Sequence, residues 1–338
     1  MDFAETLKKY DGVRTLSIAF PSSIFDNTPA PQLEAYLVGQ LARAATVFKV
    51  TEVIIFNEDN SNETKARQER IIKLFEYAEC PQYLRKMLHP IEPDLKFAGL
   101  ISPLEAQHHL RRSQLECPYR EGFTVRHTQI ERKGKLEDST EVNIGLSKNV
   151  VVSGHHQTNT RVTVKVDPSD LKKMESSMLG HTQTPPLAMI VPPVEPLEKL
   201  NLYWGYYVRP AASLSQAISE NIFHPKKKNF YDLIIGTSER GDVIDDVNFV
   251  KKRPNSIKTD GHTSKKLKHE FNHILVVFGG VRGLEHSASC DESLKSVGNV
   301  STLFDYWINT CPNQGSTTIR TEEAILISMS ALRNKLNL

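Results

Sequence analysis

Apolar runs and helical spacing alternate in the first eighty residues of the chain. Residues 14–20 and 52–56 are short apolar runs, which are typical of buried strands. Between them, apolar residues recur every three or four positions over 33–48, after a proline-containing start at 28–31 that suits a first helical turn. Residues 64–79 return to helical spacing. The order strand, helix, strand, helix predicts parallel strands covered by helices on both faces.

The pattern changes near residue 117 and stays different to about residue 199. Three short runs rich in Val and Thr predict strands: 121–125, 141–145 and 160–166. Prolines then cluster between positions 185 and 196. We therefore expect a small β-barrel module over residues 117–199, inserted into one discontinuous domain made of residues 1–116 and 200–338. A long irregular excursion is the alternative.

Three further apolar runs follow in the last third of the chain, and each ends in a loop rich in Gly, Ser, Thr or Asn. The runs are 231–235, 273–278 and 303–308, and the loops are 236–241, 279–285 and 309–316. Ligands of open α/β sheets bind beyond the carboxyl ends of the strands, and glycine lets backbone approach them closely. These loops predict a pocket with mostly main-chain contacts, which suits a nucleoside-like ligand. A last helix is expected from about Thr321, which could serve as its N-cap.

Several familiar chemistries lack their motifs in this sequence. The loop after residue 278 does not have the G-x-G-x-x-G order, and Walker A, G-x-S-x-G and H-E-x-x-H motifs are absent. The four cysteines form no C-x-x-C pair, so we expect neither a disulfide framework nor a metal site. The adjacent pairs His108-His109 and His155-His156 cannot share a helix face. We expect them to be surface or barrel residues rather than ligands.

Composition adds little until the distribution of charge is considered. The 338 residues are 39% hydrophobic and 24% charged, as in ordinary globular proteins, and no apolar run is long enough for a membrane helix. The first twenty residues do not resemble a secretory signal. The net charge is only +2, but residues 251–270 hold seven Lys or Arg against two Asp or Glu, and Lys226 to Lys228 add a second basic run. The basic loop 242–270 could bind RNA, act as a nuclear import signal, or be a solvated insertion.

The loops near the carboxyl terminus resemble those of the SPOUT RNA methyltransferases, closest to their eukaryotic and archaeal branch. The similar segments are 16–26, 79–85, 202–209, 236–241, 278–285 and 309–326, so that the resemblance covers nearly the whole chain. It implies an α/β fold in which a Rossmann-like parallel sheet ends in a C-terminal trefoil knot, with an inserted OB-like β-barrel. It also implies S-adenosyl-L-methionine as cofactor, RNA as partner and a homodimer.

The resemblance also implies which residues hold the cofactor. Carried over position by position, they are Thr237, Arg240, Gly279, Gly280, Asn309, Thr310, Gln314, Gly315 and Ile319. Two of these have another interpretation. Thr310 could simply finish a strand, and Arg240 could be a surface ion-pair partner.

The segment 319–324 is similar to the signature of bacterial SPOUT enzymes that methylate uridine N3 in ribosomal RNA. This favours an RNA methyltransferase in which Arg320 stabilises the negative charge that develops on the base. Arg320 could instead pair with Glu322, Glu323 or a partner subunit, and Glu285 could orient it or cap a helix. The barrel module offers only Tyr119 and Phe123 for stacking on bases.

Two rival functions stay open at this point. One is a non-catalytic RNA-binding protein that retains the SPOUT fold, and the other is a small-molecule methyltransferase. The basic runs and the missing signals predict a nuclear or nucleolar protein, with the cytoplasm left open.

Overall fold

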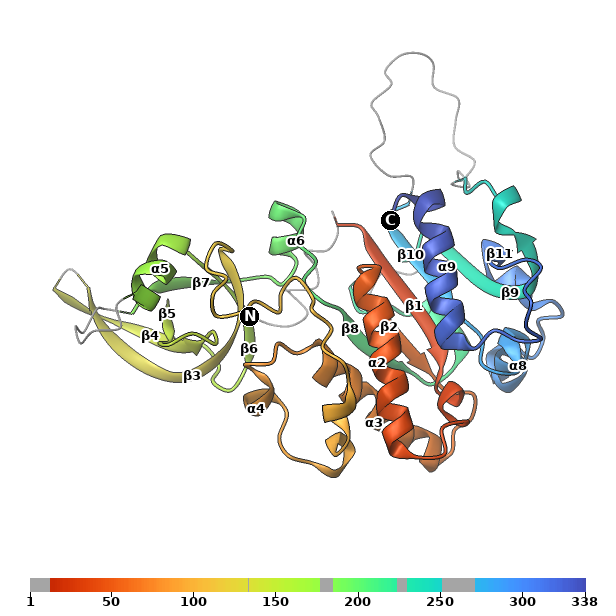
Figure 1. Ribbon diagram of the computed structural model, residues 1–338, viewed down its shortest axis with the longest axis horizontal. Coiled ribbons are helices and arrows are strands. Elements are labelled where there is room, and N and C mark those ends of the chain that lie inside the picture. The colour runs from red at the N-terminus through yellow and green to blue at the C-terminus, as the bar shows by residue number, and fades with distance from the viewer. Residues whose placement is uncertain (1–12, 133, 177–184, 224–229, 251–270) are drawn as a thin grey trace, which may run out of the picture. The chain divides into compact units, whose positions relative to one another are not determined.

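A computed structural model describes residues 13–132, 134–176, 185–223, 230–250 and 271–338 (Figure 1). The described part of the chain divides into two compact units. The sheet unit holds residues up to 76, 97–104 and those from 206 onward, and the barrel unit holds 77–96 and 105–205. Much of the basic loop, residues 251–270, and the run 226–228 lie outside the described residues.

Six parallel strands form the core of the sheet unit, in the order β11-β9-β10-β1-β2-β8. They are β1 (Thr15–Pro21), β2 (Glu52–Phe56), β8 (Tyr207–Ala211), β9 (Leu233–Val243), β10 (His273–Val277) and β11 (Tyr306–Asn309). The central strands β1, β2 and β10 are buried along their whole length, because helices cover both faces of a parallel sheet. The predicted α/β fold with a parallel sheet is confirmed.

Two boundaries differ from the prediction. We expected a strand to end at Ile235, but β9 continues to Val243, because its pairing with β11 jumps from Gly236 to Asp242 and resumes there. Residues 237–241 therefore form a bulge within the strand, a device that re-aims side chains next to binding sites. β11 is also shorter than the apolar run 303–308, whose start lies at the end of a 3-10 helix.

The helices of the sheet unit follow the spacing of the apolar residues. They are α2 (Pro31–Val47), α3 (Asn62–Glu79, which ends in the barrel unit), α7 (Leu214–Ser219), α8 (Gly283–Cys290) and α9 (Thr321–Leu336), with 3-10 turns at Ser22–Phe25, Ala98–Leu100, Ile244–Asp246, Glu292–Leu294 and Val300–Leu303. Pro31 occupies the first turn of α2, as predicted. At α9 the expected N-cap is wrong by one residue: Arg320 holds that position. The hydroxyl of Thr321 is occupied elsewhere, because it donates to the carbonyl of Gly279 at 2.9 Å.

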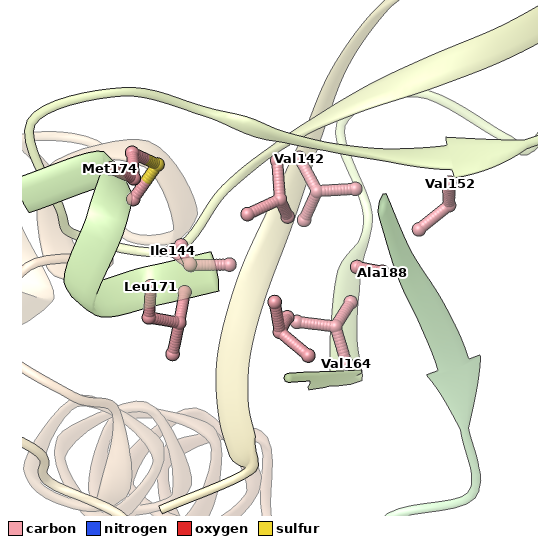
Figure 2. Packing of buried hydrophobic residues seen from close by; sticks show 9 residues of the cluster. Val142, Ile144, Val152, Val164, Leu171, Met174 and Ala188 are labelled. Carbon is pink, nitrogen blue, oxygen red and sulfur yellow. The ribbon is translucent and has the colours of Figure 1, made fainter. Parts of the chain in front are cut away.

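The barrel unit contains a closed five-stranded barrel in the order β3-β4-β5-β7-β6. Its elements are β3 (Tyr119–Arg132), β4 (Lys135–Asn143), β5 (Val150–Ser153), β6 (Arg161–Val166) and β7 (Leu187–Val191), with α4 (Arg85–Leu88), a 3-10 turn at Pro93–Leu95, α5 (Pro168–Ser176) and α6 (Glu195–Leu200). β5 and β7 pair in parallel, and the other pairs are antiparallel. Val142, Val152 and Val164 fill the interior with Leu171 and Met174 of α5 (Figure 2).

A network of buried charges lies on the outer side of β3 and β6. Because Val164 and Val166 point into the barrel, alternation turns Arg161 and Thr163 outward. The guanidinium of Arg161 donates to both carboxylate oxygens of Glu79, at 2.6 and 3.0 Å, and to Glu121 at 2.5 Å. We call Glu79, Glu121, Arg161 and their direct partners the charge seam.

Every carboxylate of the charge seam has several donors. Glu121 also accepts from the Thr163 hydroxyl and from the indole N–H of Trp204, each at 2.6 Å. Nε2 of His108 lies 2.8 Å from Glu79. Burial raises the pKa of Glu79, but Arg161 and His108 outweigh it and hold that pKa far below the ordinary value. The seam is therefore a set of charges that satisfy one another.

The aromatic and histidine residues of this unit differ from the expectation. Tyr119 and Phe123 are buried, so the barrel's two expected stacking residues do not face solvent. His108 is fully buried in this unit and is not a surface residue; its Nε2 contacts Glu79, whereas its Nδ1 has no hydrogen-bond partner. His109 lies beside it and contacts the backbone oxygen of Glu79 at 2.6 Å, and burial lowers its pKa to about 4. His155 is exposed.

Candidate active site

Three loops that follow the strands β1, β10 and β11, together with the bulge within β9, converge on one hollow of the sheet unit, with a volume of about 820 Å³. The strands are β1, β10, β9 and β11, which lie side by side in the sheet. Since all four run in parallel, their carboxyl ends meet at one edge, which is where α/β sheets bind ligands. The volume lies toward the upper end of the range for small-molecule sites.

The hollow brings together all but one of the site residues predicted from sequence. Thr237, Arg240, Gly279, Gly280, Asn309, Thr310, Gln314, Ile319 and Arg320 all line it. The exception is Gly315, which is not among the lining residues, and a side chain added there would meet open space. Three segments separated by some thirty to seventy positions therefore share one cavity.

A fourth segment, a loop that was not predicted from the sequence, also lines the hollow. Ile24, Asn27 and Thr28, between β1 and α2, line it together with Leu37 of α2. The turn at Gly280 approaches this loop closely, because a Cβ at that position would lie 2.9 Å from the hydroxyl of Ser23. The available signal was strand order: β1 pairs with β10, so its carboxyl end had to lie at the same edge.

Most polar side chains of the loops are used to hold the loops in shape. The Asn309 amide donates to the Glu239 carbonyl at 2.9 Å, and its oxygen accepts from the backbone N–H of Cys311 at 3.0 Å. The Thr310 hydroxyl lies 2.7 Å from the hydroxyl of Ser328 in α9, and Thr237 donates to the Val277 carbonyl. Ligand contacts are thus left largely to the backbone.

The turn after β10 is tightly packed against the start of α8. A Cβ at Gly279 would lie 2.7 Å from the backbone nitrogen of Leu284 and 2.8 Å from Gly283. Gly283 itself has φ +76°, a conformation that favours glycine. The glycines therefore let the start of α8 press against the turn, so that backbone groups border the hollow.

Arg240 and Arg320 differ in how their side chains are held. Arg240 approaches Glu285 to 4.0 Å, and both side chains are well exposed, which agrees with the ion-pair interpretation. The Glu323 carboxylate accepts from the backbone N–H of Arg320, at 2.9 Å. Within the described ranges, the exposed Arg320 guanidinium forms no ion pair with Glu322 or Glu323, so pairing inside the helix does not occupy it.

The chemistry of the lining fits S-adenosyl-L-methionine. Phe278, Leu284 and Ile308 are buried apolar residues at the hollow, where a neutral purine can lie. Glu239 and Glu285 also line it and can face a positively charged sulfur, beside the lining arginines Arg240, Arg282 and Arg320. A side chain at Gly279 would fill space that the turn needs, so the cradle depends on backbone.

Over the parts of the chain that the structure describes, no three His, Cys, Asp or Glu side chains are grouped to hold a metal ion. None of the helices in those parts is long and apolar enough to cross a membrane.

Comparison with known proteins shows the family to which the chain is similar. A family model described as "Putative RNA methyltransferase" matches residues 15–332. The 28S rRNA (uridine-N(3))-methyltransferases of Mus musculus and Homo sapiens are each 38% identical to the chain, over 94% of it and over 76% and 78% of their own lengths. A solved structure of a SpoU methyltransferase from Streptomyces viridochromogenes, in complex with AdoMet, aligns with 95% of this chain and with 58% of its own chain, at 10% identity. Its TM-score is 0.27, so it carries no argument here.

The extent of these matches decides the assignment. The family match takes in β1, the barrel strands, the four loops of the hollow and most of α9. The two mammalian relatives exceed 30% identity over almost the whole chain. The chain therefore belongs to this family of RNA methyltransferases.

Proposed function

We propose that the protein transfers a methyl group from S-adenosyl-L-methionine to N3 of a uridine in large-subunit ribosomal RNA. One observation carries the proposal: segments at the carboxyl ends of four neighbouring parallel strands line a single hollow, together with two exposed arginines, Arg282 and Arg320, that form no ion pair among the described residues. The curated relatives, which are named for uridine N3 of 28S rRNA, support the choice of substrate.

The protein's task in this reaction is alignment and charge stabilisation. When bound, the cofactor supplies a methyl group on a positively charged sulfur, which leaves as a neutral thioether. The chain holds cofactor and base in line. Uridine N3 must lose its proton to water as it attacks, and Arg320 stabilises the negative charge on the base. The exposed guanidinium of Arg320 at the border of the hollow supports this role.

The base has to leave its stack to reach the hollow. The basic loop 242–270 would hold the phosphate backbone, which makes affinity depend on salt. The barrel, an OB-like module in this proposal, contributes shape rather than stacking, since Tyr119 and Phe123 are buried. Its strand order and the parallel pairing of β5 with β7 support the OB-like assignment.

The knot, the domain boundaries, the homodimer and the compartment are further parts of the proposal. After β11 at the edge of the sheet, the chain returns to the β10 turn, where Thr321 bonds to Gly279; this supports a trefoil knot. The division of the domains at 116/117 and 199/200 stays a prediction.

Exposed Leu33, Tyr36 and Val47 along α2 support a homodimer. The nuclear or nucleolar location rests on the basic run 251–270, which lies outside the described residues.

Transfer of radioactivity from labelled cofactor tests the proposal. We expect ribosomal RNA to acquire label, nucleoside mass spectrometry to identify N3-methyluridine, and calorimetry to show cofactor binding. Arg320→Ala should bind the cofactor within threefold of wild type but transfer at least a hundredfold more slowly, because removing one charge-stabilising group typically costs that much. Full activity of Arg320→Ala would remove its assigned role.

The same assay separates the rivals. A non-catalytic RNA-binding protein would retain RNA on a filter without any transfer of label. A small-molecule methyltransferase would show cofactor binding that total RNA does not influence at low salt, and no label in RNA. Either result would overturn the proposal.

A further inference from the structure

Thr321 joins the first turn of α9 to the turn after β10. Its side chain is buried at 9% exposure, and its hydroxyl donates to the Gly279 carbonyl at 2.9 Å, across 42 positions of sequence. A threonine that begins a helix ordinarily has no need of such a distant partner. Here it bonds the element that carries Arg320 to the turn after β10.

The backbone N–H and the backbone carbonyl of Arg320, the residue before Thr321, are both hydrogen-bonded. Its N–H donates to the Glu323 carboxylate at 2.9 Å, and its carbonyl accepts from the backbone N–H of Ala324 at 2.8 Å. The adjacent Thr321 fixes the turn to Gly279. The backbone of Arg320 therefore has two hydrogen bonds of its own beside the Thr321 bond, while Arg320 lines the hollow and its guanidinium has no ion-pair partner among the described residues.

Other polar side chains at the hollow do not join the start of α9 to the turn after β10. The hydroxyls of Thr310 and Ser328 join the end of β11 to α9 further along the helix, near its third turn, and they hold the cofactor loop. The Asn309 amide holds the bulge of β9. Thr321 is the position whose bond connects the arginine to the loop opposite.

We propose that Thr321 is a positioning residue for methyl transfer, which sets the place of the Arg320 guanidinium through its bond to the Gly279 carbonyl. The inference rests on the proposed function and deepens it, because it names what places the charge that the base requires. Misplacing a reacting group by about an ångström can slow a reaction by about a hundredfold, whereas binding of the cofactor does not need the arginine.

Thr321→Val removes the hydroxyl and nearly keeps the shape. We expect single-turnover methyl transfer to slow at least tenfold, while the cofactor dissociation constant stays within threefold. Thr321→Ser, which retains the donor, should return the rate to within threefold of wild type. Thr46→Val is the matched control: its hydroxyl also donates to a backbone carbonyl, that of Ala42 in α2, but it lies outside the hollow and should leave transfer unchanged.

A double variant distinguishes positioning from general structure. In an Arg320→Ala background, Thr321→Val should slow transfer by less than twofold further, because the group that it positions is gone. A wild-type rate for Thr321→Val, or an undiminished tenfold loss without Arg320, would overturn the inference. Should Thr321→Val fail to fold, Thr321→Ala compared with Thr321→Ser gives the same contrast. Inactivity of the wild-type chain would count against the proposed function itself, whereas an active wild type with unaffected variants would count against Thr321 alone.

Discussion

The charge seam of the barrel unit and the hollow of the sheet unit use charge in opposite ways. In the seam, Glu79, Glu121 and Arg161 are bonded to one another, and burial with close pairing shifts the pKa of Glu79 strongly. At the hollow, the Arg320 side chain is exposed and has no ion-pair partner among the described residues. Strongly shifted groups often mark active sites, but structural ion-pair networks shift them too. Here the uncommitted charge, rather than the most perturbed one, identifies the site.

The largest expected effect that tests this contrast is the loss of a seam charge. Arg161→Ala leaves two buried carboxylates without their cation, so we expect the free energy of unfolding to fall by about 3–5 kcal/mol. Urea unfolding in a Trp307→Phe background measures it, because Trp204 of the seam is then the chain's single tryptophan reporter.

Arg126→Ala is the matched control in the same unit. Its partner Glu141 is 3.0 Å away, but the Arg126 side chain is 71% exposed, so the loss should be under about 1 kcal/mol. Equal losses for the two variants would show that the seam is no more than a surface pair. Cofactor affinity of Arg161→Ala, measured below its unfolding midpoint, should stay within twofold.

The second largest effect is expected from acid, which should lower the free energy of unfolding through the histidine and the carboxylate of the seam. The pKa of His109 is lowered in the folded state from 6.5 to about 4, so the unfolded chain binds a proton more readily. The contribution of His109 to the free energy of unfolding is fully present above pH 6.5 and is lost as the pH falls toward 4. The loss between pH 7.5 and 5 should be about 2 kcal/mol. Below 4.5, the lowered pKa of Glu79 adds a loss of the same sign. Urea titrations across this range measure it.

The control for this effect is His109→Gln, which keeps an N–H donor but cannot be protonated. We expect a flatter dependence of unfolding on pH between 7.5 and 5 than in wild type. The same slope in both proteins would mean that another group titrates.

At the hollow, backbone shape should matter more than charge for the cofactor. Gly279→Ala places a methyl group 2.7 Å from the backbone nitrogen of Leu284, so the turn must shift. We expect cofactor affinity to fall ten- to thirtyfold by calorimetry, or about 1.4–2 kcal/mol. Gly99→Ala is the control, since nothing lies within 4 Å of its added carbon and affinity should not change. Unchanged binding by Gly279→Ala would argue against a backbone cradle.

The smallest effect is expected from Arg240→Ala. The exposed pair that Arg240 forms with Glu285 at 4.0 Å is worth under about 1 kcal/mol. We therefore expect cofactor affinity to fall less than fivefold. A loss larger than that of Gly279→Ala would show that Arg240 contacts the cofactor directly.

The sequence predicted the sheet and three of the four loops well, because both leave local signals. Apolar runs that end in glycine-rich loops indicate parallel strands and their carboxyl ends. The fourth loop, at 24–28, depends on β1 lying beside β10, which no local pattern reveals. The same applies to the bulge of β9, which depends on its pairing with β11.

The charge seam could not be predicted for a related reason. Glu79, Glu121 and Arg161 lie some forty positions apart and become partners only when the barrel closes. His108 was expected at the surface or in the barrel, and not as a ligand, because the adjacent pair His108-His109 cannot share a helix face. In the structure it is buried with its Nε2 against the carboxylate of Glu79, a partner 29 positions away in the sequence.

The register of β1 has a consequence for synthesis. Thr15 pairs with His273, and the partner strand of β1 on that side is made only after more than three quarters of the chain. The residues of the hollow extend further, to Ser328. A nascent chain that ends before residue 319 thus lacks Ile319, Arg320 and the α9 residues of the hollow, and has no complete cradle. Contacts of such long range also slow folding, so the edge of β1 that pairs with β10 stays open until residues 273–277 have been made.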